Sequence, residues 1–194
     1  ENEAFLGCIS LENIIIPSTV KIIGENVFEN CESLKQIEIP SSVQSIGNKA
    51  FLGCLSLKDI SISSSIDSIK KSLFENCESL KQIKIPESVV SIEDNAFSGC
   101  LLLTNVLIPS SVKTIGKKVF ENCESLQQIT IPESIQSIDD NAFLRCKSLK
   151  KIIISTSVQR IGNKIFKGCT SLTHITIPSS VQTIEKDTFE ECFS

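Results

Sequence analysis

The stretch Leu34-Lys-Gln-Ile-Glu-Ile-Pro40 decides the fold, because its pattern returns every 23 residues along the chain. Leucine opens every copy, isoleucine or valine stands three residues later, and isoleucine stands two residues beyond that. A run so short and so rich in β-branched residues is typical of a strand. Proline ends the run in six of the eight copies and stops the hydrogen-bonded ladder, because it has no N–H. We therefore predict short strands that stack in parallel into one wall.

A second motif, Ala96-Phe-Ser-Gly-Cys100, follows the same period without insertion or deletion. Its phenylalanines fall at Phe5, Phe28, Phe51, Phe74, Phe97, Phe120, Phe143, Phe166 and Phe189. A third motif, Val112-Lys-Thr-Ile115, gives each unit a second apolar pair. A unit of 23 residues cannot bury its own apolar face, so units stack and share one core. We predict a repeat solenoid of about eight units in a right-handed coil, with a strand wall, a second short strand opposite and a short helical turn at the corner.

A longer period of 46 residues lies on top of the first. Residues 28–50, 74–96 and 120–142 resemble one another more than their neighbours, and each begins Phe-Glu-Asn-Cys-Glu-Ser-Leu and ends in Ala. Two interpretations stay open. The alternation records only how the repeats duplicated, or it forms a surface that alternates on every second coil, with Glu29, Glu75 and Glu121 along one edge.

Composition excludes several classes of protein. Hydrophobic residues make up 41% and charged residues 22% of the chain, which is ordinary for a folded protein. The net charge of −4 offers no basic footprint for a phosphate backbone, so we expect no nucleic-acid partner. No apolar run approaches the length of a membrane span.

The motifs Leu34-Lys-Gln-Ile-Glu-Ile-Pro40 and Ala96-Phe-Ser-Gly-Cys100 resemble those of the BspA-like class of leucine-rich repeats, also called the Treponema-pallidum type. The glycine that follows the Val-x-x-Ile pair in that class is kept at Gly24, Gly47, Gly116 and Gly162. In other units Lys, Glu or Asp replaces it, so a positive φ is not required there. The resemblance covers the whole chain and implies surface antigens and adhesins that bind proteins, with no catalytic residues and no cofactor.

The nine cysteines form one column, three residues after each phenylalanine. Zinc sites need close cysteine pairs that face one point, whereas one cysteine per coil never converges. Adjacent coils bring the Cα atoms within disulfide range, but parallel side chains would strain the bond. We expect a ladder of nine buried free thiols, with coil-to-coil disulfides and metal binding as the alternatives.

Catalytic motifs are missing from the sequence. It contains no nucleophile elbow, phosphate loop, metalloprotease helix or calcium loop. His174 is the only histidine, and it shares a column with Gln36, Gln82 and Gln128, which predicts that it faces outward, away from the column of Cys169. We expect a protein that is not an enzyme.

The outward columns of the strand wall vary from unit to unit while the core columns do not. One column contains Ile15, Leu107 and Ile153 where its other members are polar, either as scattered exposed apolar residues or as contact points. The candidate binding residues on this wall are Asn105, Leu107, Lys151, Ile153 and His174.

These observations predict a single array over residues 1–194 that binds protein partners, as an adhesin-like module at the cell surface. The alternative is a structural protein whose arrays pack end to end or side by side into a coat or filament. A cytoplasmic location is the alternative compartment, because free thiols suit a reducing environment. Both ends fall inside a unit without an atypical cap, so we expect a fragment of a longer array or end-to-end self-association.

Overall fold

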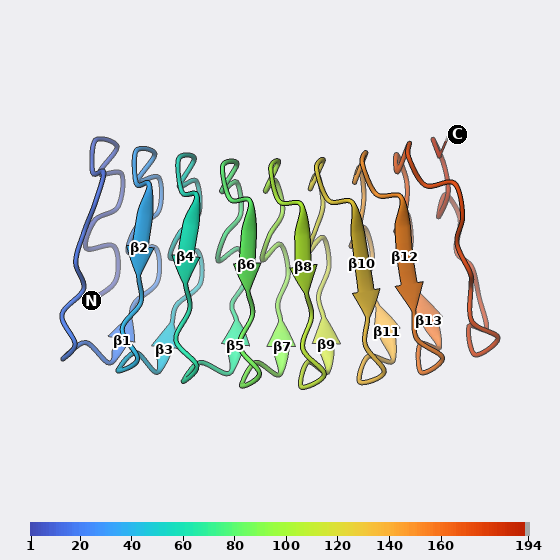
Figure 1. Cartoon of the computed structure of the whole chain (residues 1–194), viewed down its shortest axis with the longest axis horizontal. Coiled ribbons are helices and arrows are strands. Elements are labelled where there is room, and N and C mark those ends of the chain that lie inside the picture. The colour runs from blue at the N-terminus through green and yellow to red at the C-terminus, as the bar shows by residue number, and fades with distance from the viewer. Residues whose placement is uncertain (193–194) are drawn as a thin grey trace.

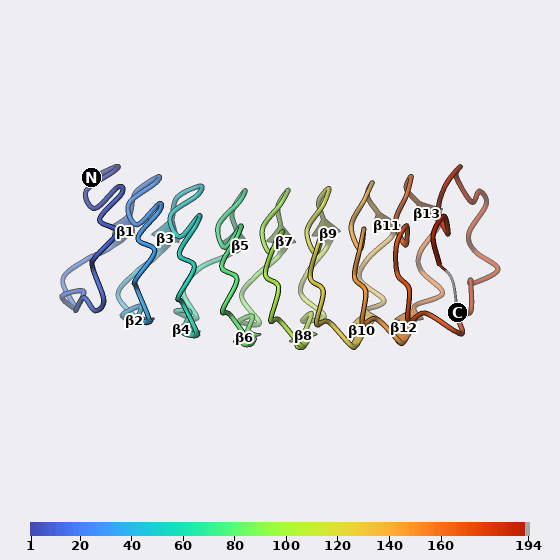
Figure 2. The ribbon, with the colours of Figure 1, turned by 90° about the horizontal axis from the view of Figure 1, so that it is seen from above.

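The computed structural model describes residues 1–192 and shows a solenoid whose short strands form two walls (Figure 1). The strand wall holds β2 (Gln36–Glu38), β4 (Asp59–Ser61), β6 (Gln82–Lys84), β8 (Asn105–Leu107), β10 (Gln128–Ile131) and β12 (Lys151–Ile154). The second wall holds β1 (Ile22–Ile23), β3 (Ser45–Ile46), β5 (Ser68–Ile69), β7 (Ser91–Ile92), β9 (Thr114–Ile115), β11 (Ser137–Ile138) and β13 (Arg160–Ile161). The two walls lie on opposite sides of the array (Figure 2).

All strand pairs are parallel, and their partners lie one repeat apart. In the strand wall Lys84 pairs with Leu107 and Thr130 with Ile153, while in the second wall Ser91 pairs with Thr114. The predicted repeat solenoid with a parallel strand wall and short second strands is therefore confirmed.

Each wall is interrupted once, on the two sides of the same coil. The strand wall divides into β2-β4 and β6-β8-β10-β12, and the second wall into β1-β3 and β5 to β13. The coil concerned contains Ser63, one of the two residues that replace the proline of the repeat. The strand wall also has no strand in the coil after its counterpart Ser155, whereas the second wall continues there through the bridge between Ile161 and Ile184.

The predicted helical corner is wrong, because no residue between 1 and 192 is helical. Each corner is a pair of tight turns in which two residues adopt a positive φ, as Asn26 (56°) and Asn30 (59°) do. Left-handed residues prevent a continuous helix. Their peptide N–H groups donate to the next coil instead, as from Asn30 to the Leu52 carbonyl at 2.7 Å. The apolar residues at helical spacing therefore lie on tight turns rather than on a helix. The hydrogen bonds of these turns form a third ladder between coils, in addition to the ladders of the two walls.

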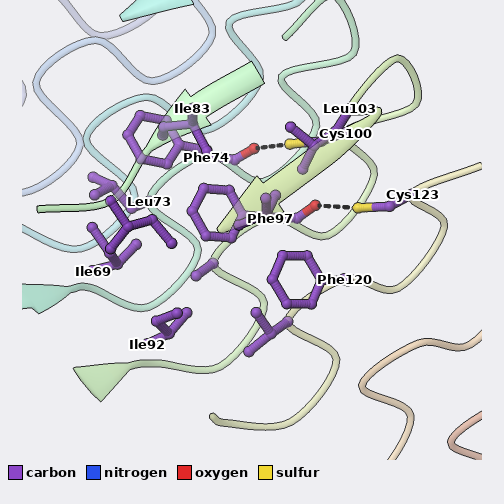
Figure 3. Packing of buried hydrophobic residues seen from close by; sticks show 14 of the residues in the cluster. Ile69, Leu73, Phe74, Ile83, Ile92, Phe97, Cys100, Leu103, Phe120 and Cys123 are labelled. Atoms are coloured by element: carbon purple, nitrogen blue, oxygen red, sulfur yellow. Dashed lines mark hydrogen bonds between the residues drawn. The ribbon is translucent and has the colours of Figure 1, made fainter. Parts of the chain in front are cut away.

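The core is a set of columns that run the length of the array. Phe5 to Phe189 form a continuous stack with ring centroids 5.3–5.9 Å apart and planes within 18° of parallel. Beside it, each cysteine thiol from Cys31 to Cys192 donates to the carbonyl of the phenylalanine in the coil before it, as Cys100 does to Phe74 and Cys123 to Phe97 (Figure 3). The structure corrects one expectation: Cys8 is exposed and Cys192 half-buried, so the nine thiols are not all buried. Cys8 lies in the first described coil.

The 46-residue period has a structural counterpart at the second positive-φ position of the corner. Asn30, Asn76 and Asn122 occupy it in one set of coils, and Gly7, Gly53 and Gly99 in the coils between. A Cβ at Gly53 would meet Oδ1 of Asn30, and one at Gly99 would meet Oδ1 of Asn76. The asparagine of one coil therefore occupies the space that the glycine of the next coil leaves, and the alternation has a packing role as well as a duplication history.

Candidate functional site

The strand wall presents two exposed residues around each buried one. In β8, for example, Val106 is buried while Asn105 and Leu107 face solvent. Burial of the central residue follows from the strand's alternation, which directs neighbouring side chains to opposite faces. The wall is therefore an exposed surface on a fixed core, and its side chains can change from coil to coil without disturbing the fold.

The structure brings four of the five candidate residues onto one sheet. Asn105 and Leu107 lie in β8, and Lys151 and Ile153 lie in β12, with β10 between them. Gln128 pairs with both Asn105 and Lys151, so these three side chains form one row. Leu107 is 74% exposed and Ile153 is 48% exposed.

His174 lies one coil further along, outside any strand. Its side chain is exposed, as its column predicts, and Nδ1 lies 3.0 Å from the Thr173 hydroxyl. Its role in binding, like that of the other four residues, stays a prediction.

A shallow groove of about 840 Å³ lies on the other half of the same wall. It spans four successive coils, from Asn13 to Lys84, and crosses the interruption between β4 and β6. Ile15, at its first coil, is 93% exposed. Sequence reasoning missed the groove, because the curvature of a wall depends on how coils are offset rather than on which residues vary. Ile15 was its only signal.

The cysteine column is unsuited to nucleophilic chemistry. Burial raises the pKa of the Cys54 thiol to about 12 and that of Cys169 to about 12, with neighbouring thiols adding to the rise. A protonated thiol is a poor nucleophile and a poor metal ligand. Cys169 also donates its hydrogen bond to the Phe143 carbonyl rather than to a base. Within residues 1–192 no group of three metal-binding side chains converges, and no helix is long and apolar enough to span a membrane.

The sequence of this array matches the model of a known protein family. A model of the BspA type leucine rich repeat region matches residues 1–108 and 90–194, in six copies. The chain belongs to the BspA-type leucine-rich repeat family. No relative was found among curated proteins.

Solved structures agree with this membership. The BspA-type array is 31% identical to a leucine rich repeat protein of T. pallidum, over 82% of this chain and 77% of that one, with a TM-score of 0.77. It is 29% identical to a leucine-rich repeat protein from Bacteroides ovatus, over 92% of this chain and 63% of that one, with a TM-score of 0.53. The pneumococcal vaccine antigen PcpA, at 23% identity, 88% and 46% coverage and a TM-score of 0.61, shares the fold.

The corner of the BspA-type array carries the second surface that the sequence suggested. Glu29, Glu75 and Glu121 lie there on alternate coils and are half-buried. Leu6, one coil before Glu29, and Leu52, one coil after it, occupy the same column, and Leu6 is 45% exposed. Glu121 lies 3.3 Å from the ammonium of Lys118. The three glutamates therefore do lie along one edge, on alternate coils. The use of this alternating edge in binding stays a hypothesis.

Proposed function

We propose that this chain is a non-catalytic binding array of a cell-surface protein, adhesin-like in action, and that it holds a protein partner on its strand wall. One observation supports the wall above other surfaces: its outward column contains the two most accessible large apolar residues within residues 1–192, Ile15 and Leu107. The same column holds a third exposed apolar residue, Ile153, and its other members are polar. Apolar side chains that stay exposed on an ordered surface are typical of interaction sites.

Relatives support the location. A protein from Faecalibacterium prausnitzii described as a leucine rich cell surface protein shares the fold at 24% identity, with a TM-score of 0.53. The pneumococcal relative is described as a vaccine antigen. Both descriptions favour a protein that is exposed outside the cell, and antibody labelling of intact cells compared with permeabilised cells tests this directly.

The binding test compares two pairs of substitutions on the same chain. Leu107→Ser with Ile153→Ser removes the apolar contacts of the strand wall, and Ile22→Ser with Val90→Ser removes similar exposed side chains from the second wall. Purified wild-type and variant arrays are presented to a panel of purified extracellular proteins by biolayer interferometry. We expect a partner that the first pair loses and the second pair keeps. A partner lost only when Glu29, Glu75 and Glu121 are changed would instead assign binding to the alternating edge.

The assembly function is the second candidate. An apolar hollow of about 230 Å³ opens at the first coil, between Phe5, Val20 and Phe28. Such a surface would suit a stacked neighbour. Light scattering across a range of concentrations distinguishes the candidates, because end-to-end packing gives a mass that grows with concentration.

A further inference from the structure

The strand wall changes its charge at the interruption between β4 and β6. Beyond it lies the sheet β6-β8-β10-β12. We call this sheet, together with the residue that precedes each of its strands, the lysine sheet. Its outward residues are Lys81, Gln82, Lys84, Thr104, Asn105, Leu107, Gln127, Gln128, Thr130, Lys150, Lys151 and Ile153. Four of these are lysines and none is a carboxylate.

The rest of the molecule has the opposite balance. The chain contains 19 basic and 23 acidic residues, and the lysine sheet takes four of the basic ones and none of the acidic. On the coils before the interruption the same wall contains Glu12, Glu38 and Asp59 against the two lysines Lys35 and Lys58. There Lys35 is neutralised by Glu12, with 2.7 Å between Nζ and Oε2. The positive charge of the lysine sheet is thus a local feature of an acidic protein.

The four lysines of the sheet are not used within the array. Across residues 1–192, ion pairs engage Lys70, Lys117, Lys147 and Lys167 on other surfaces, whereas Lys81, Lys84, Lys150 and Lys151 have no carboxylate within 4.0 Å. Lys150 and Lys151 are adjacent and both exposed, so their like charges repel without compensation. Replacing these lysines would therefore break no ion pair within the array.

Apolar side chains lie among these charges at fixed places. Leu107 pairs in register with Lys84, and Ile153 pairs with Thr130 and lies two residues from Lys151. Strands about 4.8 Å apart set Leu107 and Ile153 about 10 Å from each other across two coils. The neighbouring row, two residues earlier on each strand, contains the amides Gln82, Asn105 and Gln128, which can both donate to and accept from a peptide main chain.

We propose that the lysine sheet binds an acidic, extended segment of a protein partner, whose apolar side chains contact Leu107 and Ile153 while its carboxylates face the four lysines. The inference rests on the proposed function of the strand wall and adds the chemistry of the partner. Charge complementarity selects carboxylates, and it acts mainly on specificity and association rate, so the apolar contacts are needed for retention. Nucleic acid fits less well, because the sheet carries no arginine and no aromatic ring on which a base could stack.

The experiment uses the 194-residue chain and labelled peptides of about eight residues, long enough to cross four strands. One peptide repeats Glu-Ser-Leu-Ser, which places Glu and Leu on the same face of an extended chain, a second replaces Glu by Gln, and a third replaces Leu by Ser. Fluorescence anisotropy gives the affinities, and a labelled DNA duplex serves as the phosphate probe. We expect the Glu/Leu peptide to bind about tenfold or more tightly than either of the others, and binding to weaken as salt rises from about 0.05 to about 0.5 M.

Two charge reversals locate the site. Lys150→Glu with Lys151→Glu should weaken Glu/Leu binding about tenfold or more, whereas Lys21→Glu with Lys113→Glu, on the second wall, should leave it unchanged. Equal losses for both pairs, equal binding of the Gln/Leu peptide, or tighter binding of the duplex would overturn the inference. A protein partner lost with Leu107→Ser and Ile153→Ser but kept with the lysine reversal would overturn it too, and would leave the proposed function intact.

Discussion

Cys100 donates a hydrogen bond from its thiol to the carbonyl of Phe74, 3.2 Å away and 26 residues earlier in the chain. The same bond joins each cysteine from Cys31 to Cys192 to the coil before it. The Phe74 residue is fully buried, and its carbonyl also accepts the N–H of Cys77 in its own coil at 3.1 Å, so the thiol is a second donor to this oxygen. The cysteine column is thus a line of short side chains that fill the core and add a second hydrogen bond to one carbonyl per coil.

Stability should fall at alkaline pH because of this column. Burial raises the pKa of Cys54 to about 12, from 9.0 for a free thiol. The unfolded chain therefore loses this proton first as pH rises, and the folded state becomes less favoured between about pH 9 and 12. Each such thiol contributes about 1.4 kcal/mol per pH unit in that window. Urea unfolding at pH 8 to 11 measures the slope.

Replacing one thiol gives the control for the alkaline effect. Cys54→Ala removes one titrating group, so its unfolding free energy should depend less steeply on pH than that of the wild type. At pH 7 the same change costs only the lost packing and hydrogen bond, about 1–2 kcal/mol. Parallel pH curves for the two proteins would mean that the thiols do not cause the loss.

Thiol reactivity should separate Cys8 from the seven buried cysteines, Cys31 to Cys169. Cys8 is exposed, while Cys31 to Cys169 are buried and hydrogen-bonded. We expect a thiol reagent at pH 8 to modify Cys8 rapidly in the native protein, and about nine thiols after denaturation without reductant. Cys8→Ser should abolish the rapid phase. A denatured count short by pairs would reveal disulfides and refute the free-thiol ladder.

The phenylalanine stack should provide much of the stability. Phe97 lies between Phe74 and Phe120, with ring centroids 5.5 and 5.6 Å away, and is fully buried. Phe97→Ala opens a cavity that three coils share, and we expect a loss of about 3–5 kcal/mol in urea unfolding. Lys81→Ala, on the exposed wall, should change the midpoint little. Similar losses for both variants would contradict the assignment of the core.

The sequence alone predicted the buried columns, because the strict 23-residue period determines them. The columns of Phe97, Cys100 and Leu103 repeat without error, and each is buried as expected. The corner could not be predicted, because the spacing of apolar residues fits a helical turn and a pair of tight turns equally well. The deciding signal was the alternation of Asn76 and Gly99, the two residue types that best tolerate a positive φ.

The binding surface was predictable only in part. Variation from coil to coil identified the exposed positions Leu107 and Ile153, because a core column cannot vary in this way. The groove and the interruption at β4 depend on small offsets between coils, which no single residue encodes. The charge contrast across the wall was already present in the sequence at Lys150 and Lys151, but it acquires meaning only when β6 to β12 are known to form one sheet.

Two glycines should respond differently to the same substitution, because they are required for different reasons. Gly99 has a φ of +74°, and its added Cβ would meet Oδ1 of Asn76, the end of an exposed side chain that can rotate away. Gly116 has no positive φ, which agrees with the expectation from its column, but its Cβ would lie 2.5 Å from Oδ1 of Asp94 and 2.7 Å from the backbone nitrogen of the same residue.

Gly99→Ala should cost about 1–3 kcal/mol, from the left-handed backbone and the displaced asparagine. Adding Asn76→Gly should recover about 1 kcal/mol of that loss. Gly116→Ala should cost about 3 kcal/mol, and Asp94→Gly should recover little of it, because it removes the side-chain oxygen but leaves the main-chain atoms of Glu93 and Asp94 in the way. Urea unfolding of the six variants, with the two single controls Asn76→Gly and Asp94→Gly included, gives both coupling energies. Equal recovery at the two sites would show that side-chain crowding, rather than the approach of one coil's backbone to the next, keeps the glycine at position 116.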